Sequence, residues 1–381
     1  MTMRIGITCY PTVGGSGVIA TELGKMLAEE GNEIHFITSS LPFRLDKLYP
    51  NIFYHGVELG QYPVFQYPPY DLALATKMAD VIDQEELDIL HVHYAVPHAI
   101  CAILAKDIAE RDVKIITTLH GTDITVLGVD QTFKKMIKYG IEHSDAVTAV
   151  SNSLVQQTKE MISTEKDISV IYNFVNEQEY FPRYHSPLKE QYGIKANEKI
   201  VIHISNFRKV KRVHDVVYTF QKVVQSVDSK LILVGDGPEY ASTLQLVRDL
   251  GIENDVLFLG KQNSISEILS ISDLLLLLSE KESFGLVLLE AMACKVPCIG
   301  TNIGGIPEVI KHKETGYIVD LGDVEQASAY AIHLLKDNSR LKRFSENAYS
   351  YIQAQFKSEQ IIQQYIDLYH EVLENGEQHA R

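Results

Sequence analysis

The chain has 381 residues, of which 45% are hydrophobic and 22% charged, and its formal net charge is -15. This length favours two domains, and this composition is that of an ordinary folded protein, which excludes disordered and disulfide-stapled classes. The amino-terminal half carries most of the negative charge. An acidic surface repels phosphate backbones and anionic lipids, so we expect neither nucleic-acid nor membrane binding.

Apolar strand-like runs alternate with helical segments along most of the chain, which predicts repeated βα units. In the first half we expect strands at residues 4–10, 33–38, 89–93, 114–119, 146–150 and 168–172. In the second half we expect strands at residues 199–204, 230–234, 256–259, 273–278, 297–300 and 317–319. Strands that are apolar on both faces predict parallel sheets covered by helices on both sides.

The βα rhythm stops between residues 176 and 197, where Pro182 and Pro187 interrupt it, and we place a linker there. The first domain is then residues 1–175 and the second 198–355, and residues 356–381 predict a helix that packs back on the first domain. The expected fold class is α/β, with two Rossmann-like, doubly wound parallel-sheet domains facing a central cleft.

The four cysteines show no Cys-x2-Cys pair, which argues against a zinc ribbon or a disulfide framework and predicts buried thiols. The amino terminus has no cationic start followed by an apolar segment. The apolar run at residues 274–278 is far shorter than the roughly 20 residues that span a bilayer. We therefore expect a cytoplasmic protein.

A glycine-rich turn from Pro11 to Gly17 lies between the first strand and a helix predicted over residues 18–30. Its glycines let the backbone approach an anion, and free N–H groups at a helix start favour negative charge. We interpret this turn as a phosphate site, with a plain tight turn as the alternative.

A basic turn at residues 205–212 follows the first strand of the second half. The carboxyl ends of parallel strands border the ligand crevice, so Arg208 and Lys211 can clamp a pyrophosphate there. The alternatives are a solvated turn and a nucleic-acid patch, and the acidity of the chain disfavours the patch.

Two carboxylates, Glu282 and Glu290, lie eight residues apart around a helix expected to begin near Phe284 and Gly285. A carboxylate in so apolar a helix is costly unless it accepts hydrogen bonds, and sugar hydroxyls are good donors. The alternative is that the backbone or a lysine satisfies Glu290.

Four motifs together resemble the retaining glycosyltransferases of the GT-B fold, family 4 type, over essentially the whole chain. They are the Glu-x7-Glu spacing of Glu282 and Glu290 and the glycine-containing segments at residues 14–17, 235–239 and 304–308. Within that family, the resemblance implies transfer of N-acetylglucosamine from UDP-GlcNAc to L-malate with retention, which is the first step of bacillithiol biosynthesis. A same-fold transferase with another small polar acceptor, such as an inositol phosphate or a carbohydrate, is the alternative.

The resemblance also implies donor-side roles. Glu290 holds the ribose, Glu282 holds the donor sugar, and Arg208 and Lys211 neutralise the β-phosphate. His120 contacts the transferred sugar near its 6-hydroxyl, with a neutral imidazole that caps a turn as the alternative. The implied donor set also contains Gly15, Asn206, Gly260, Lys261, Phe284, Gly285 and Leu286.

For the acceptor we expect groups at strand ends of the first domain, namely Ser16, Tyr94, Thr118 and Asn152. Malate is a dianion, so a cation is also expected, and we select Arg44 or Lys47 in the loop after the second strand.

The resemblance implies a front-face reaction in which the departing phosphate receives the acceptor proton, so we name no enzymic nucleophile. We expect no metal and no cofactor, and we interpret His91, His93 and His98 as packing residues. A non-catalytic nucleotide-sugar sensor and a pyridoxal-phosphate phosphorylase are less favoured alternatives. Whether the protein forms a homodimer is left open.

Overall fold

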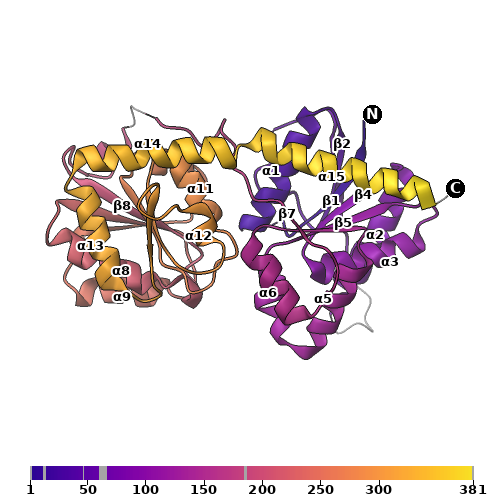
Figure 1. Cartoon of the computed structure of the whole chain (residues 1–381), viewed down its shortest axis with the longest axis horizontal. Helices are drawn as coiled ribbons and strands as arrows, with labels where there is room; N and C mark the ends of the chain where they lie inside the picture. Colours follow the sequence, from indigo (N-terminus) through magenta and orange to yellow (C-terminus); the bar gives the residue numbers. More distant parts are fainter. Residues whose placement is uncertain (1, 12–13, 46, 60–66, 184–186, 380–381) are drawn as a thin grey trace. The chain divides into compact units, whose positions relative to one another are not determined.

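The computed structural model describes residues 2–11, 14–45, 47–59, 67–183 and 187–379. The chain divides into two compact units, Met1–Asn173 with Glu359–Arg381, and Phe174–Ser358. Each unit is a parallel sheet with helices on both faces, as Figure 1 shows. This confirms the α/β class and the two Rossmann-like domains. Residues 176–197, where we expected a linker, fall in the second unit.

The first sheet has seven parallel strands in the order β3-β2-β1-β4-β5-β6-β7. The strands are β1 (Arg4–Thr8), β2 (Glu33–Thr38), β3 (Ile52–Gly56), β4 (Ile89–His93), β5 (Lys114–Leu119), β6 (Ala146–Ala149) and β7 (Ser169–Val170). The inner strands are apolar and buried, as the sequence predicts. The edge strand β3 is one that we did not predict, and its Phe53 and Tyr54 are exposed.

Helices on the two faces of the first sheet contact alternate residues of the strands. Gly24 of α1 (Gly15–Glu29) lies against the Phe36 ring. The next residue, Ile37, packs in a cluster with α2 (Tyr70–Gln84) and α3 (Ile100–Ile108). Because successive strand residues point to opposite faces, α1 and the α2–α3 pair cover opposite sides. The remaining helical segments are η1 (Ala95–Ala99), α4 (Thr122–Thr125), η2 (Leu127–Val129), α5 (Gln131–His143) and α6 (Asn152–Ile162).

The last helix, α15 (Ser358–His379), lies along the first unit. Its Tyr369 is completely buried, and the Tyr369 hydroxyl lies 2.7 Å from Nδ1 of His91 on β4. A buried hydroxyl needs such a partner, so this contact fixes the helix against the sheet.

The second sheet has six parallel strands in the order β10-β9-β8-β11-β12-β13. They are β8 (Lys199–Ile204), β9 (Ser229–Val234), β10 (Val256–Gly260), β11 (Leu274–Leu277), β12 (Cys298–Thr301) and β13 (Gly316–Val319). All six were predicted to within two residues at either end. The parallel order places the carboxyl ends of these strands, with the predicted donor loops, at one edge of the sheet.

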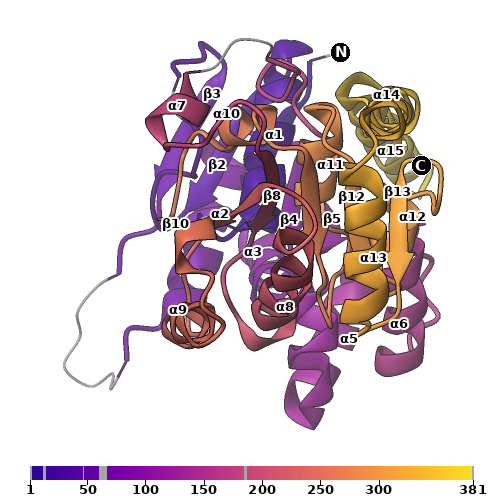
Figure 2. The ribbon, with the colours of Figure 1, turned by 90° about the vertical axis from the view of Figure 1, so that its left-hand side faces the viewer.

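Helices cover both faces of the second sheet, and α8, α9 and α13 stand in front of it in Figure 2. Val216, Val247 and Ala331 from these three helices share one hydrophobic cluster with the strands. The helical segments are α7 (Leu188–Gln191), η3 (Lys209–Lys211), α8 (Val213–Val224), α9 (Tyr240–Asp249), η4 (Glu253–Asp255), α10 (Ile265–Ser270), α11 (Leu286–Ala293), α12 (Ile306–Val309), α13 (Val324–Leu335) and α14 (Asn338–Gln355). Across the described residues, none of the helices has the length and apolar character that crossing a membrane requires.

Candidate active site

The basic turn after β8 is shaped by two non-glycine residues in the left-handed region. Phe207 has φ 37° and Arg212 has φ 47°, a conformation that is uncommon outside glycine. The Phe207 side chain is fully buried, which holds the turn to the domain core. Arg208 is exposed and its guanidinium, within the described residues, has no hydrogen-bond or ion-pair partner, whereas Lys211 is half-buried.

Lys211 and Glu282 meet in an ion pair. The Lys211 Nζ lies 2.6 Å from Oε2 of Glu282, and both side chains are mostly covered, at 20% and 15% exposure. Partial burial weakens solvent screening, so this pair is stronger than one on the open surface. The structure therefore joins two residues that we had assigned to different parts of the donor.

Glycines fasten the turn after β9 onto the basic turn. A Cβ at Gly235 would overlap the Ser205 carbonyl oxygen, and a Cβ at Gly237 would overlap that of Asn206. The Gly235 N–H donates to the Gly260 carbonyl at 2.8 Å. Only residues without a side chain allow this approach, which explains the glycine-containing motif at residues 235–239.

A second glycine pair fastens the segment that carries Glu282. A Cβ at Gly304 would overlap the Glu282 carbonyl oxygen, and the Gly305 N–H donates to the same oxygen at 3.1 Å. On the other side, the Glu280 N–H donates to the Val210 carbonyl at 2.7 Å. The backbone of the Glu282 loop is thus held between the turn after β12 and the basic turn.

The helix α11 begins at Leu286, with Gly285 as its N-cap at φ 91°, close to where we predicted it to start. Glu290 lies inside this helix and is only 8% exposed. The Phe284 side chain is 2% exposed and packs edge-on against Phe356. Phe284 can therefore offer a ligand its backbone but not its ring.

The other predicted donor residues of the second unit lie on the surface of its strand-end loops. Asn206 and Lys261 are exposed, and Gly260 has φ 63° with open space where a Cβ would be. Gly260 is joined to Gly235 through its carbonyl oxygen. The structure thus brings Asn206 and Gly260 to neighbouring turns.

In the first unit, the glycine-rich turn leads directly into α1. Gly14 is the N-cap of this helix, and no side chain of the described residues caps its first N–H groups. Space is open around the Cα of Gly15. Thr12 and Val13 of the predicted phosphate loop lie outside the described residues.

Two predicted acceptor residues contact each other. The Tyr94 hydroxyl donates to the Ser16 Oγ at 2.8 Å. Tyr94 has φ 87°, a strained value for a residue with a ring. Burial raises the pKa of Tyr94 to about 12, so its hydroxyl stays protonated and is a hydrogen-bond donor at neutral pH.

His120 is a neutral imidazole in a cluster of aromatic rings. Its Nε2 lies 2.8 Å from Nδ1 of His93, and the two rings stack with centroids 5.0 Å apart. Burial lowers the pKa of His120 to about 3. Its Nδ1 has no partner among the described residues, so that nitrogen is the one left to face a ligand.

Thr118 does not fit the acceptor role that we predicted. Its side chain is fully buried, and its Oγ1 lies 2.7 Å from both His91 Nε2 and Thr148 Oγ1. This places Thr118 inside a hydrogen-bonded chain within the core. We therefore remove it from the acceptor set and regard it as a packing residue.

The other residues predicted to bind the acceptor lie outside this hydrogen-bonded chain of Thr118, His91 and Thr148. Asn152 is the first residue of α6, and its Nδ2 donates to the Tyr172 hydroxyl at 2.7 Å. Arg44 is half-buried with φ 70°, and its guanidinium lies 5.8 Å from the centre of the Phe43 ring. Lys47 is exposed. Of the two cations, Arg44 is therefore the more covered.

Comparisons with known proteins identify the family. The model for Glycosyltransferase Family 4 matches residues 13–179, and that for Glycosyl transferases group 1 matches residues 186–351. N-acetyl-alpha-D-glucosaminyl L-malate synthase of Bacillus anthracis is 62% identical over 373 residues, which are 98% of each chain. The chain belongs to the family 4 glycosyltransferases.

Solved structures of similar shape support the GT-B fold of this glycosyltransferase. Sucrose-phosphate synthase from Thermosynechococcus elongatus superposes with a TM-score of 0.83 at 21% identity, covering 98% of this chain and 100% of that one. Anabaena HepE in complex with UDP and glucose gives a TM-score of 0.81 at 21% identity, covering 96% and 99%. At such identities the likeness is one of fold.

Asp123 is a residue of this glycosyltransferase that our sequence reasoning did not select. Its carboxylate is fully buried and accepts hydrogen bonds from the N–H groups of Ala95 and Gly121, each at 3.0 Å. Burial raises the pKa of Asp123 to about 6. By joining the turns that follow Tyr94 and His120, it sets how both side chains are presented. An acidic residue directly after a strand-end glycine turn was the signal that could have indicated it.

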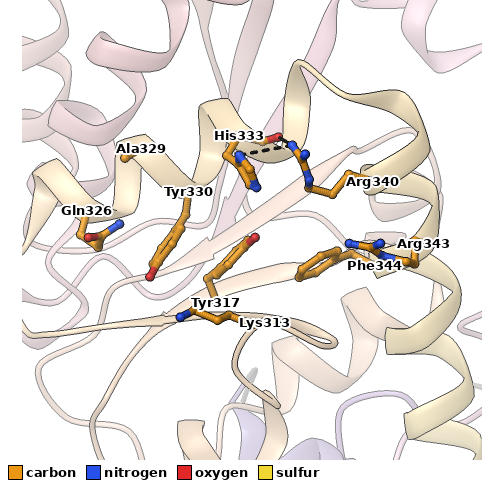
Figure 3. A pocket seen from close by; sticks show the side chains of 9 residues that line it. All are labelled: Lys313, Tyr317, Gln326, Ala329, Tyr330, His333, Arg340, Arg343 and Phe344. Carbon is orange, nitrogen blue, oxygen red and sulfur yellow. Dashed lines mark hydrogen bonds between the residues drawn. The ribbon is translucent and has the colours of Figure 1, made fainter.

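A cavity of about 450 Å³ on the second unit lies away from the predicted donor loops. Figure 3 shows its lining side chains, among them Tyr317 and Tyr330, whose rings stack, and Arg340 and Arg343. Its lining contains none of the predicted site residues, and Lys313 and Tyr317 lie before or within β13 rather than after its carboxyl end. We assign it no part in glycosyl transfer.

Proposed function

We propose that this glycosyltransferase transfers N-acetylglucosamine from UDP-GlcNAc to the hydroxyl of L-malate with retention, as the first step of bacillithiol biosynthesis. The observation that carries the proposal is its full-length 62% identity with the Bacillus anthracis enzyme named for this product. The donor-side geometry of the second unit supports it, because it combines two cations with two mostly buried carboxylates.

On the donor side, Arg208 and Lys211 neutralise the negative charge that grows on the β-phosphate as the glycosidic bond breaks. An ammonium has three N–H donors, so Lys211 can hold the phosphate while it remains near Glu282. Glu282 then accepts hydrogen bonds from sugar hydroxyls, and Glu290 accepts them from the ribose. The first turn of α11 adds backbone N–H groups and the positive end of its dipole.

On the acceptor side, the first unit supplies Tyr94 and Ser16 as hydrogen-bonding groups and Arg44 as the cation for a malate carboxylate. His120 is neutral, so its free ring nitrogen hydrogen-bonds a sugar hydroxyl without adding charge. The departing phosphate oxygen takes the proton from the malate hydroxyl as the new bond forms on the same face. With two cations on the donor, the proposed reaction uses no metal and no organic cofactor.

Incubation of the purified protein with UDP-GlcNAc and L-malate tests this function. We expect UDP release that depends on L-malate, and an α-linked product whose anomeric configuration is read by NMR. Matched reactions with D-malate, an inositol phosphate and a simple carbohydrate test acceptor choice. Faster release with one of these would favour the alternative acceptor, and release with none of the four would reject transferase activity on small polar acceptors.

A further inference from the structure

A second cluster of polar side chains lies at the edge of the first sheet. His35 on β2 and His55 on β3 face the same side, and the His35 Nδ1 lies 2.9 Å from the His55 Nε2. Glu85, at the carboxyl end of α2, completes the cluster, because its carboxylate and the two ring nitrogens all lie within 4.8 Å of one another. Among the described residues, this is the one group of three His, Cys, Asp or Glu residues with metal-binding spacing.

The surroundings of His35 match the support that a metal-binding histidine usually has. Its other ring nitrogen, Nε2, lies 3.1 Å from the Glu33 carboxylate. A carboxylate behind a ligating histidine fixes the ring and increases its donor strength. The Phe53 ring stacks on His35 with centroids 5.0 Å apart, and His35 is fully buried. One ligand of the cluster is thus held rigidly before any ion arrives.

We propose that His35, His55 and Glu85 form a binding site for a first-row divalent cation, with Zn²⁺ as the preferred ion. Two imidazoles and one carboxylate are a ligand set that Zn²⁺ accepts, with solvent in a fourth position. Zinc–nitrogen bonds of about 2.0–2.1 Å at a tetrahedral angle place the two nitrogens about 3.3 Å apart. The observed 2.9 Å separation therefore needs only a small outward movement of the half-buried His55.

The site lies where three elements of the first unit meet. An ion held there bridges β2, the edge strand β3 and the end of α2. An ion that binds only the folded state stabilises it. Burial is the main cause that lowers the pKa of His55, and the charge of Lys77 is a smaller one. The Lys77 charge opposes the ion, whereas the carboxylates of Glu85 and Glu33 favour it.

The opposing explanation is a plain histidine–histidine hydrogen bond that stabilises the edge strand. A titration of metal-free, untagged full-length protein with Co²⁺ separates the two, because tetrahedral Co²⁺ reports its ligands through visible absorption. We expect one Co²⁺ per chain with a tetrahedral spectrum, displaced by Zn²⁺, and a higher melting temperature with Zn²⁺ present.

His55→Gln is the main test variant, because His55 is half-buried and its replacement disturbs the fold less than replacement of the fully buried His35. We expect this variant to lose the Co²⁺ spectrum and the Zn²⁺-dependent rise in melting temperature while keeping its circular dichroism. Glu33→Gln should weaken Co²⁺ binding about 10- to 100-fold. The matched control His143→Gln removes an exposed imidazole of the same unit and should bind normally. Absence of Co²⁺ binding by the parent protein, or equal binding by His55→Gln, overturns the proposal.

Discussion

Lys211 and Glu282 are 71 positions apart in the chain and 2.6 Å apart in space. Their contact means that the cation proposed for the phosphate is already held in position. A charge that is oriented before the reaction needs little reorganisation during it. The Arg208 guanidinium, in contrast, is exposed and has no partner among the described residues, so a bound phosphate would order it.

Lys211→Ala removes the oriented cation and should lower kcat by about 10²- to 10³-fold, as the loss of one charge-stabilising donor does elsewhere. Steady-state kinetics of UDP release measures this effect. Lys209→Ala is the matched control, because Lys209 is exposed in the same turn. Equal losses in the two variants would show that the turn needs only its total charge.

Asp123→Asn tests the positioning role of the buried carboxylate. An amide keeps one acceptor oxygen but turns an NH₂ group toward one of the backbone N–H donors of Ala95 and Gly121. We expect a loss of about 1–3 kcal/mol in unfolding free energy, the cost of an unsatisfied buried group. Urea denaturation measures this loss. Unchanged stability would mean that the two turns keep their shape without the carboxylate.

The sequence predicts which loops carry charge, but it does not predict which side chains remain accessible. Thr118 illustrates the difference, because its position at a strand end suggested a ligand group. Its hydroxyl is instead used by His91 and Thr148, on the two strands that flank β5. Hydrogen-bond partners on neighbouring strands depend on the strand order and on the face of the sheet to which each residue points. The spacing of residues along one segment predicts neither.

At the scale of elements, apolar runs predicted twelve of the strands because buried parallel strands are apolar on both faces. The sequence did not predict strand β3, because this strand lies at the edge of the sheet. There Phe53 and Tyr54 stay exposed, and His55 interrupts the apolar run. The Glu282 loop was predicted from its charges, but its fastening by Gly304 and Gly305 required the structure.

Gly304→Ala should displace the Glu282 loop, because the new Cβ overlaps the Glu282 carbonyl oxygen. Gly193→Ala is the matched control, since Gly193 also has a positive φ, 68°, but has open space around its Cα. Both variants carry the backbone strain of about 1–2 kcal/mol. We expect only Gly304→Ala to weaken UDP binding, and isothermal titration calorimetry measures the UDP affinity of both variants. Equal UDP affinity in both variants would contradict this role.

At the scale of the whole molecule, buried histidines link stability to pH. Burial lowers the pKa to about 3 for His91 and His120 and to about 4 for His98, from 6.5. The unfolded chain therefore binds more protons than the folded one below pH 6.5, so stability falls as the pH drops toward 4. Asp123, whose pKa is raised to about 6, acts in the opposite direction.

Urea unfolding at pH 7.5 and at about pH 5 should show lower stability at the acidic pH, because the lowered pKa values of the buried histidines, which also include those of His93 and His203, outweigh the raised pKa of Asp123. His98→Gln should reduce this pH dependence, whatever it does to stability at pH 7.5. His143→Gln, at an exposed site, should leave the dependence unchanged. A pH dependence that is the same in all three proteins would assign the effect to other groups.

Three of the contacts that hold the donor loops run through main-chain atoms, from Glu280 to Val210, from Gly305 to Glu282 and from Gly235 to Gly260. Main-chain N–H and carbonyl groups are the same for nearly every residue type, so the loops keep their shape when their exposed side chains change. We therefore expect mostly folded proteins from a variant library that randomises exposed positions such as Asn206, Lys209 and Lys261. The library keeps the four glycines that pack closely against neighbouring backbone, Gly235, Gly237, Gly304 and Gly305. Screening that library with different nucleotide sugars would test whether the exposed positions set donor preference while the loops keep their shape.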